Sequence, residues 1–319
     1  MRKLFYGISV VAMVLGMVAC DDSVSSANNE DADKESSSSV ISEDASSSSV
    51  KPGYSSSVEL ASSSSVKLVS SSSVKPGSSS SKNDDPKSSS SRGLFDMTKD
   101  EFLNPEITYG TMTDKRDNKT YKTVKIGNQV WMAENLNYAD SAKTPSLMGK
   151  SWCYDNKAEN CDVAGRLYTW AAAIDSVALA NDADNPQTCG YGKTCALPAV
   201  VQGVCPSGWH LPTYDEWPTL FKAVGGSSAA GKALKSGSGW YSNGNGTDAY
   251  GFSALPAGYR ISNGSFDSAG NYADFWSASQ GGYGSDIAYS MYLLYYYEYA
   301  NMDYNYKDFG YSVRCLQNN

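Results

Sequence analysis

The sequence predicts an α+β domain of short helices packed on small antiparallel sheets, with long loops and disulfide staples. Aromatic residues show where this domain lies, because residues 94–319 hold 21 of the 23 tyrosines and all seven tryptophans. Within this region, helical patterns precede a series of short, loop-separated strand patterns, which is the order typical of α+β proteins. Six cysteines in the same region, an even number, indicate a disulfide framework.

Residues 1–19 are predicted to be a lipoprotein signal peptide. Arg2 and Lys3 precede an apolar stretch that ends at Ala19, and this stretch is shorter than the roughly 20 residues that a membrane-spanning helix needs. The stretch closes in GMVAC, which resembles a bacterial lipobox and makes Cys20 the candidate lipidated residue. We therefore expect a protein of the bacterial cell envelope, lipid-anchored at the outer membrane or cell surface. The alternative is an ordinary signal peptide in which Cys20 is incidental.

Residues 20–93 are predicted to be a disordered, serine-rich tether. Seven clusters of three or four serines lie between residues 36 and 92. The unit SSSSV, once shortened to SSSV, recurs there, and its last four copies are spaced eight residues apart. Such a sequence buries too little apolar area to offset its chain entropy. As a flexible coil of about 70 residues it spans on the order of 45 Å, so it would hold the domain away from a membrane.

Three disulfides are expected in the domain, although six cysteines allow 15 pairings. The spacing favours two local bridges and one long one: Cys153–Cys161, Cys189–Cys195 and Cys205–Cys315. The long bridge would close a loop of about 110 residues, worth on the order of 4.7 kcal/mol in the chain-entropy model. A zinc site is disfavoured because the chain has no C-x-x-C motif and a single histidine. We expect neither a metal nor a cofactor.

The first half of the domain is expected to contain a hairpin and a helix. In residues 121–136, a Gly127-Asn128 pair separates two runs of β-forming residues, which predicts a β-hairpin. Residues 165–180, GRLYTWAAAIDSVALA, carry apolar residues at helical spacing and are predicted to form one helix.

A second helix is expected near the middle of the domain. Thr213 and Glu216 form the T-x-x-E pattern of a capping box. This pattern predicts a helix from Tyr214 to about Val224, ended by the glycine pair that follows. Pro218, one turn inside it, would remove a backbone hydrogen bond.

A further short helix and several strands complete the expected elements. The helix is AAGKALK, residues 229–235. The strand patterns are GFSALPAGYR, DFWSAS, IAYSMYLLYYY and GYSVRCLQ, which begin at Gly251, Asp274, Ile287 and Gly310.

The segment GVCPSGWHLPTYDEW, residues 203–217, holds the only histidine of the chain. A catalytic His210 would need a nucleophile or a metal, and the chain has no G-x-S-x-G motif. Trp209, Leu211 and Trp217 are expected to be core anchors. We therefore interpret His210 as a structural residue and predict no catalytic residue.

Three other polar features are interpreted as structural. Arg314, between Val313 and Cys315 on the expected last strand, is assigned to an ion pair rather than to an anion site. The segments YDNKAENCD and NGNGTDAYG are rich in oxygen atoms, but neither has the spacing of a calcium-binding EF-hand loop. Solvated turns are expected in both.

The C-terminal tyrosines are the candidate ligand-binding residues. Residues 289–306 hold eight tyrosines, and we interpret them as one strand through Tyr297, a turn, and a second strand. Strand propensity and cross-strand pairing account for about half of these tyrosines. The others are predicted to form an exposed aromatic face suited to stacking on sugar rings. The residues assigned to that face are Tyr296, Tyr299, Tyr304 and Tyr306.

Several segments together resemble one known family. In chain order they are TDKRDNKTYKTVKIGNQVWMAENLNY, GRLYTW, GVCPSGWHLPTYDEW, DAYGFSALPAGYR, FWSAS and GYSVRC. Over about Tyr109 to Gln317, they are similar to the Fibrobacter succinogenes major paralogous domain family. This family consists largely of lipoproteins and secreted proteins without an established activity, so the resemblance implies an envelope setting but no reaction. The motifs W-x-L-P-T…E-W and G-x-S-V-R-C are similar to those of the C-type lectin-like fold, which formylglycine-generating enzymes also use, and they imply that fold.

Charge and motif content restrict the function classes. A net charge of −8 without basic runs disfavours nucleic acids and anionic membrane surfaces as partners. We predict a lipid-anchored envelope module without catalysis, which binds polysaccharide or another surface component, including surface proteins. The alternatives are an enzyme of the formylglycine-generating type, whose reactive cysteines we cannot match here, and a purely structural surface protein. A deep pocket with convergent polar groups would favour the enzyme, and a flat, exposed aromatic face would favour binding.

Overall fold

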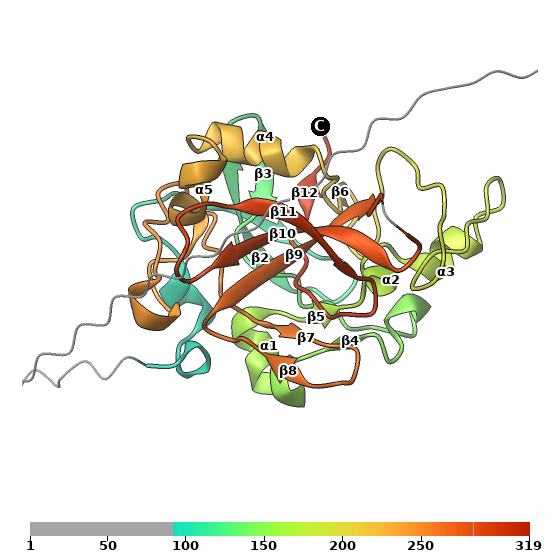
Figure 1. Ribbon diagram of the computed structural model, residues 1–319, viewed down its shortest axis with the longest axis horizontal. Coiled ribbons are helices and arrows are strands. Elements are labelled where there is room, and N and C mark those ends of the chain that lie inside the picture. The colour runs from blue at the N-terminus through green and yellow to red at the C-terminus, as the bar shows by residue number, and fades with distance from the viewer. Residues whose placement is uncertain (1–91, 283) are drawn as a thin grey trace, which may run out of the picture. The chain divides into compact units, whose positions relative to one another are not determined.

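The computed structural model describes residues 92–282 and 284–319 (Figure 1). The predicted signal peptide, the predicted lipid attachment at Cys20 and nearly all of the predicted tether lie outside the described residues. The first described element is a 3-10 helix at Leu94–Asp96, and its Leu94 packs against Phe102 and Leu255. The first residue of the predicted domain is thus also the first residue of this helix and part of a small core.

A five-stranded antiparallel sheet has the strand order β1-β2-β3-β12-β6. Its strands are β1 (Gly110–Thr113), β2 (Thr120–Ile126), β3 (Gln129–Met132), β6 (Trp209–His210) and β12 (Leu316–Gln317). β2 and β3 form the predicted hairpin, in which Ile126 lies opposite Gln129 and Gly127 adopts φ +60° in the tight turn. Because β12 lies between β3 and β6, the C-terminal segment is held in the interior of this sheet.

A three-stranded antiparallel sheet follows, with the order β11-β10-β9. Its strands are β9 (Tyr272–Gln280), β10 (Ile287–Leu294) and β11 (Asn301–Tyr306), drawn in orange and red in Figure 1. β10 ends at Leu294, so the prediction that the strand continues through Tyr297 was wrong. Two short ribbons complete the sheets, β4 (Ser151–Trp152) with β5 (Leu167–Tyr168) and β7 (Tyr259–Arg260) with β8 (Phe266–Asp267).

The two predicted helices after His210 are α4 (Glu216–Ala223) and α5 (Ser227–Leu234). α4 ends before the predicted glycine pair, whose residues have φ of +105° and +95°. It begins two residues later than predicted, since residues 214–215 form a turn, although the Glu216 carboxylate accepts a hydrogen bond from the Thr213 backbone N–H as the capping-box pattern predicts. Pro218 therefore lies in the first helical turn, where an N–H has no intrahelical acceptor. The expected loss of a hydrogen bond at Pro218 was wrong for this reason.

The prediction of one continuous helix over residues 165–180 was also wrong. The segment contains β5, α2 (Trp170–Ala173) and α3 (Ser176–Ala180). The Thr169 hydroxyl caps α2, and the Asp175 carboxylate caps α3 while its backbone adopts φ +52°. Short polar side chains that bond to nearby backbone groups thus interrupt a segment whose apolar spacing is helical.

Irregular backbone replaces most of the strand that was predicted from Gly251. Only its last two residues belong to β7. Ser253 has φ +51° and Gly258 has φ +66°, conformations that end a strand, and Pro256 lies between them. The remaining helices are α1 (Ala158–Ala164) and 3-10 turns at Lys99–Phe102, Pro145–Leu147, Tyr154–Asn156 and Tyr241–Asn243.

Two clusters of buried side chains lie on opposite faces of the three-stranded sheet. Consecutive residues of a strand point to opposite faces, so Phe275 joins the cluster under α4 and α5 while Trp276 joins the other. The rings of Trp217 on α4 and Phe275 on β9 have centroids 6.0 Å apart. Three disulfides with the pairings that the spacing favours support this core: Cys153–Cys161, Cys189–Cys195 and Cys205–Cys315.

Candidate functional site

His210 lies in a buried hydrogen-bond network between β6, α4 and the C-terminal segment. Its Nδ1 is 2.7 Å from Asn318 Oδ1, and its Nε2 is 3.0 Å from Glu216 Oε1. The other Glu216 oxygen accepts hydrogen bonds from the backbone N–H and the hydroxyl of Thr213, at 2.7 and 2.9 Å. Both ring nitrogens of His210 are therefore occupied, and neither is available to activate a nucleophile.

This network shifts both of its titratable groups toward their charged forms. Burial lowers the pKa of His210, but the hydrogen bonds to Glu216 and Asn318 outweigh burial and leave the pKa above its usual value. Burial raises the pKa of Glu216, but His210 and Thr213 outweigh it and hold the pKa below its usual value. His210 and Glu216 therefore form a partly buried ion pair between β6 and α4. Asn318 connects the C-terminal segment to the same histidine.

Arg314 is fully buried, but the ion pair predicted for it is absent among the described residues. Its guanidinium donates hydrogen bonds to Asn135 Oδ1 and to the backbone carbonyls of Phe252 and Ser253. It also lies over the Phe252 ring, 4.4 Å from the centroid. Burial lowers the pKa of Arg314 to about 9, against the attraction of Asp248. The prediction was wrong because irregular backbone at residues 252–253 supplies the acceptors.

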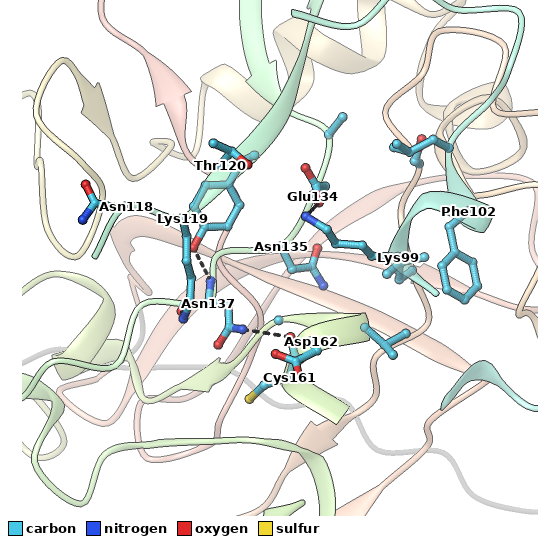
Figure 2. Close-up of a pocket in the computed structure, with 17 residues that line it drawn as sticks. Lys99, Phe102, Asn118, Lys119, Thr120, Glu134, Asn135, Asn137, Cys161 and Asp162 are labelled. Atoms are coloured by element: carbon cyan, nitrogen blue, oxygen red, sulfur yellow. Dashed lines mark hydrogen bonds and ion pairs between the residues drawn. The ribbon is translucent and has the colours of Figure 1, made fainter. Parts of the chain in front are cut away.

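A cavity of about 350 Å³ lies between the 3-10 turn at Lys99–Phe102, the start of β2, the segment after β3 and α1, and Figure 2 shows the residues that line it. Lys99 and Glu134 point toward each other in it, with Nζ and Oε1 2.8 Å apart. The Asn137 amide donates to the Cys161 carbonyl at 3.1 Å, and the Asn135 amide donates to the Ala164 carbonyl at 2.8 Å. These polar groups are paired with one another or with backbone, so they do not converge on a common point where a reacting group would sit.

A group of tyrosines, four of them exposed and Tyr289 half-buried, lies along the edge strand β11, and we call it the tyrosine strip. Its members are Tyr191, Tyr214, Tyr289, Tyr304 and Tyr306. Tyr289 on β10 lies directly opposite Tyr304 on β11, with ring centroids 6.4 Å apart. The Tyr214 ring lies 4.6 Å from the Tyr289 ring. Tyr306, two residues after Tyr304 and therefore on the same face, lies 6.4 Å from Tyr191 in the Cys189–Cys195 loop.

A second group of rings forms the connection between β10 and β11, and we call it the tyrosine turn. Its members are Tyr295, Tyr296, Tyr297 and Tyr299. The Tyr297 ring lies 4.2 Å from Tyr296 and is stacked on Tyr299 at 4.3 Å. The Lys235 ammonium holds the backbone of this turn, because it donates to the carbonyls of Leu294, Tyr295 and Tyr297 at 2.9–3.2 Å.

The structure therefore divides the four predicted ligand-binding residues. Tyr304 and Tyr306 belong to the tyrosine strip, whereas Tyr296 and Tyr299 belong to the tyrosine turn. The rings of Tyr296 and Tyr299 pack against Tyr297 of the turn, and burial together with the neighbouring Tyr297 and Tyr292 raises the pKa of Tyr299. Tyr292 is three residues from Tyr289 on β10, so its side chain points to the face opposite the strip. The four residues do not form one continuous face.

Sequence reasoning missed three members of the tyrosine strip, one of which, Tyr289, lies in the tyrosine-rich segment but was not assigned to the binding face. Tyr214 was expected only as the first residue of a helix, and Tyr191 had no assignment. Their proximity to β10 and β11 comes from tertiary packing, which no local pattern records. A signal for Tyr191 does exist, since it is the single aromatic residue in the small, polar disulfide loop CGYGKTC and exposed aromatic loop residues are typical of binding sites.

Two further properties concern metals and membranes. Among residues 92–282 and 284–319, no three side chains of the His, Cys, Asp or Glu type are grouped so as to hold a metal ion. In the same part of the chain, no helix combines the length and the apolar character that crossing a membrane requires.

Comparison with known proteins gives one match. Residues 124–317 match the sequence model of the Fibrobacter succinogenes major domain. No curated protein and no solved structure matches the chain. The matched range begins within β2 and ends with β12, and so includes the tyrosine strip, the tyrosine turn and all three disulfides.

Proposed function

The chain belongs to the Fibrobacter succinogenes major domain family, and from this premise we propose that it is a non-catalytic module of the bacterial cell envelope that binds polysaccharide through the tyrosine strip. The main observation behind this proposal is that tyrosines of the strip are exposed to solvent. Tyr304 and Tyr306 keep 46% and 52% of their surface exposed, and Tyr214 keeps 37%. Apolar rings gathered at a surface are unfavourable in water unless they meet a partner. Rings with a hydroxyl at the tip can stack on a sugar and bond its hydroxyl groups.

The setting is part of the same proposal. A signal peptide over residues 1–19, a lipid on Cys20 and a serine-rich tether over residues 20–93 would present the domain at a distance from the membrane. The three disulfides support export, because such bonds persist in oxidising compartments. We also propose that the domain has the C-type lectin-like fold, on the motifs around residues 209–217 and 310–315.

The rival function is an enzyme of the formylglycine-generating type, which depends on reactive thiols. All six cysteines of the described region are in disulfides, so no thiolate is available there as a nucleophile. The polar groups of the cavity in Figure 2 are paired with one another or with backbone carbonyls rather than convergent. A surface component other than polysaccharide, including a surface protein, remains the alternative ligand within the binding proposal.

A pull-down assay with insoluble plant-type polysaccharides tests this function. We expect the wild-type protein to be depleted from solution by at least one polysaccharide. Tyr304→Ala and Tyr306→Ala should each weaken binding about fivefold or more, because loss of one aromatic contact removes about 1 kcal/mol. The melting temperature should change little, since these rings are about half exposed.

The matched control is Tyr250→Ala, which removes an exposed tyrosine outside both the strip and the turn. It should bind like wild type. Tyr304→Phe should retain most of the stacking and so lose less affinity than Tyr304→Ala. If the wild type binds no polysaccharide, or if strip and control variants lose affinity equally, the binding proposal is wrong. The interpretation as a purely structural surface protein then replaces it.

A further inference from the structure

Another pocket, of about 300 Å³, lies on the face of the three-stranded sheet opposite the tyrosine strip. Asp274 of β9 and Asp303 of β11 line it. Asp303 precedes Tyr304 in β11, so the two side chains point to opposite faces. Asp274 lies opposite Tyr292 in the ladder, which places it on the same face as Asp303. The two carboxyl groups of the pocket and the ring of Tyr304 therefore lie on opposite faces of the sheet, while Tyr306 of the strip contacts the pocket-lining ring of Phe309, with centroids 5.8 Å apart.

Asp274 has a buried carboxyl group, one oxygen of which lacks a hydrogen-bond partner among the described residues. Its exposed fraction is 4%, and its Oδ2 atom has no hydrogen-bond partner among the described residues. Burial, with a smaller contribution from the charge of Asp303, raises the pKa of Asp274 to about 8. A buried polar group without a partner destabilises the folded protein. No described protein group thus donates a hydrogen bond or offers a positive charge to Oδ2 of Asp274.

The walls of the pocket are aromatic and carry no positive charge. The Tyr259 ring lies 5.9 Å from Tyr272 and 6.0 Å from Tyr311, with interplanar angles of 86° and 78°. Among the described residues that line the pocket there is no lysine, arginine or histidine. Arg260, next to Tyr259, is engaged elsewhere, since its guanidinium lies 3.8 Å from the centroid of Trp152. Electron-rich ring faces beside carboxylates attract cations.

We infer that this pocket binds a protonated primary amine, such as a lysine side chain of a partner or an amino sugar. An ammonium group offers three hydrogen-bond donors and one positive charge, which match the unpartnered oxygen of Asp274 and the carboxylate of Asp303. In this site, the carbon atoms of the ligand that carry the ammonium group contact the rings of Tyr259 and Tyr272. A neutral hydroxyl in the same place supplies a donor but leaves both acidic groups without a counterion.

Titration calorimetry with the full-length protein tests this site, with Nα-acetyl-lysine amide as the probe. The neutral control is the same compound with an acetylated ε-amine. We expect the amine to bind at least about tenfold more tightly than its acetylated form, as a charged hydrogen bond is worth about 1.5–3 kcal/mol. Asp274→Asn should lower the affinity by a similar factor. Asp215→Asn, the same change at an exposed position before α4, should leave it unchanged.

The pH dependence provides an independent measurement. The other titratable groups on the pocket walls are Asp303, Tyr259, Tyr272, Tyr292 and Tyr311. Asp274 loses its proton as the pH rises through about 8, while a free lysine amine stays protonated to about pH 10.4. The affinity for the lysine probe should therefore rise between about pH 7 and 9 in wild type. This rise should be absent in Asp274→Asn.

Two ligand sources are separated by a second pair of probes, glucosamine and glucose. Tighter binding of glucosamine than of lysine amide would assign the pocket to amino sugars, and the reverse would assign it to lysine side chains. Absence of binding by both amines, or equal binding of charged and neutral forms, would overturn the site. If Asp274→Asn fails to fold, the affinity of Asp303→Asn for the lysine probe and the pH dependence of wild-type binding test the site instead. Tyr304→Ala should keep amine binding, so this proposal and the polysaccharide proposal can fail separately.

Discussion

The buried lysine and arginine side chains Lys235, Lys307 and Arg314 bond to backbone carbonyls and side-chain amide oxygens rather than to carboxylates. Lys235 donates to three carbonyls of the β10–β11 region, and Lys307 donates to the Lys193 and Ser285 carbonyls and to a glutamine oxygen. Arg314 does the same at residues 252–253. Nothing in the sequence distinguishes these residues from exposed lysines and arginines, because their acceptors lie in irregular backbone that is distant in the sequence. For this reason the predicted ion pair of Arg314 was wrong.

The ion pair of His210 and Glu216 predicts a pH-dependent stability. The pKa of His210 is raised above 6.5, so its charged form stabilises the folded state below about pH 6.5, and this contribution is lost as the pH rises through the folded pKa. The pKa of Glu216 is lowered below 4.5, so its contribution is present above about pH 4.5 and is lost on acidification. Thermal unfolding should therefore separate wild type from His210→Gln more at about pH 5.5 than at pH 8.

The neighbouring tryptophan supplies the control for this histidine. Trp209→Ala should destabilise the domain by about 3–5 kcal/mol at every pH, because it truncates a buried aromatic residue. His210→Ala should leave the affinity for any ligand within a few-fold, as both ring nitrogens serve internal bonds. A folded His210→Ala protein that has lost ligand binding would show that the histidine belongs to a site.

At the scale of the elements, a helix or strand could be predicted when the residues that determine its limits lie close together in the sequence. The β2–β3 hairpin was predictable because the Gly127 turn and the flanking β-forming residues are local features. The end of α4 was predictable from its glycine pair. Residues 165–180 were not, because Thr169 and Asp175 cap separate short helices within one apolar pattern. The spacing of apolar residues shows which residues are buried. Two short helices joined by a turn bury the same residues as one long helix, so the spacing does not distinguish the two arrangements.

The tyrosine segment shows the same limit. Alternation on a strand places Tyr304 and Tyr306 on one face and Asp303 on the other, so this part of the tyrosine strip follows from the sequence. The end of β10 does not follow, because Leu294 and the tyrosines after it all have strand propensity. The strand ends there in the structure, where the buried Lys235 ammonium binds the carbonyls of the turn. The pocket of Asp274 was likewise outside sequence reasoning, since it depends on the register of three strands.

The Cys205–Cys315 disulfide connects the segment before β6 to the segment that leads into β12. Its two cysteines are fully buried and 110 residues apart in the sequence. Replacing both with serine should lower the free energy of unfolding by about 4.7 kcal/mol from loop entropy alone. Replacing Cys153 and Cys161, which are 8 residues apart, should lower it by only about 2.5 kcal/mol. Denaturant unfolding of the two double variants measures both values, and equal losses would contradict the assignment of Cys205–Cys315 as the main staple.

At the scale of the whole molecule, the proposed binding role depends on where the domain is held. A surface that binds insoluble polysaccharide assists a cell only if the protein remains attached to that cell. The expected tether could extend on the order of 45 Å as a flexible coil, enough to carry the tyrosine strip away from the membrane. Attachment through a single acyl group is weak, whereas several acyl chains give stable anchoring. The proposal therefore requires a multiply acylated Cys20.

We expect Cys20→Ala to move the protein from the membrane fraction to the soluble fraction, because the substitution removes the residue that is predicted to carry the lipid. Carbonate washing of isolated membranes, followed by immunoblotting, measures this change. Cys153→Ala with Cys161→Ala removes two other cysteines and should leave the protein on the membrane. The purified Cys20→Ala protein should retain its affinity for polysaccharide, since the tyrosine strip lies within residues 191–306. A Cys20→Ala protein that resists carbonate would place the anchor elsewhere and would remove the basis for the lipid tether.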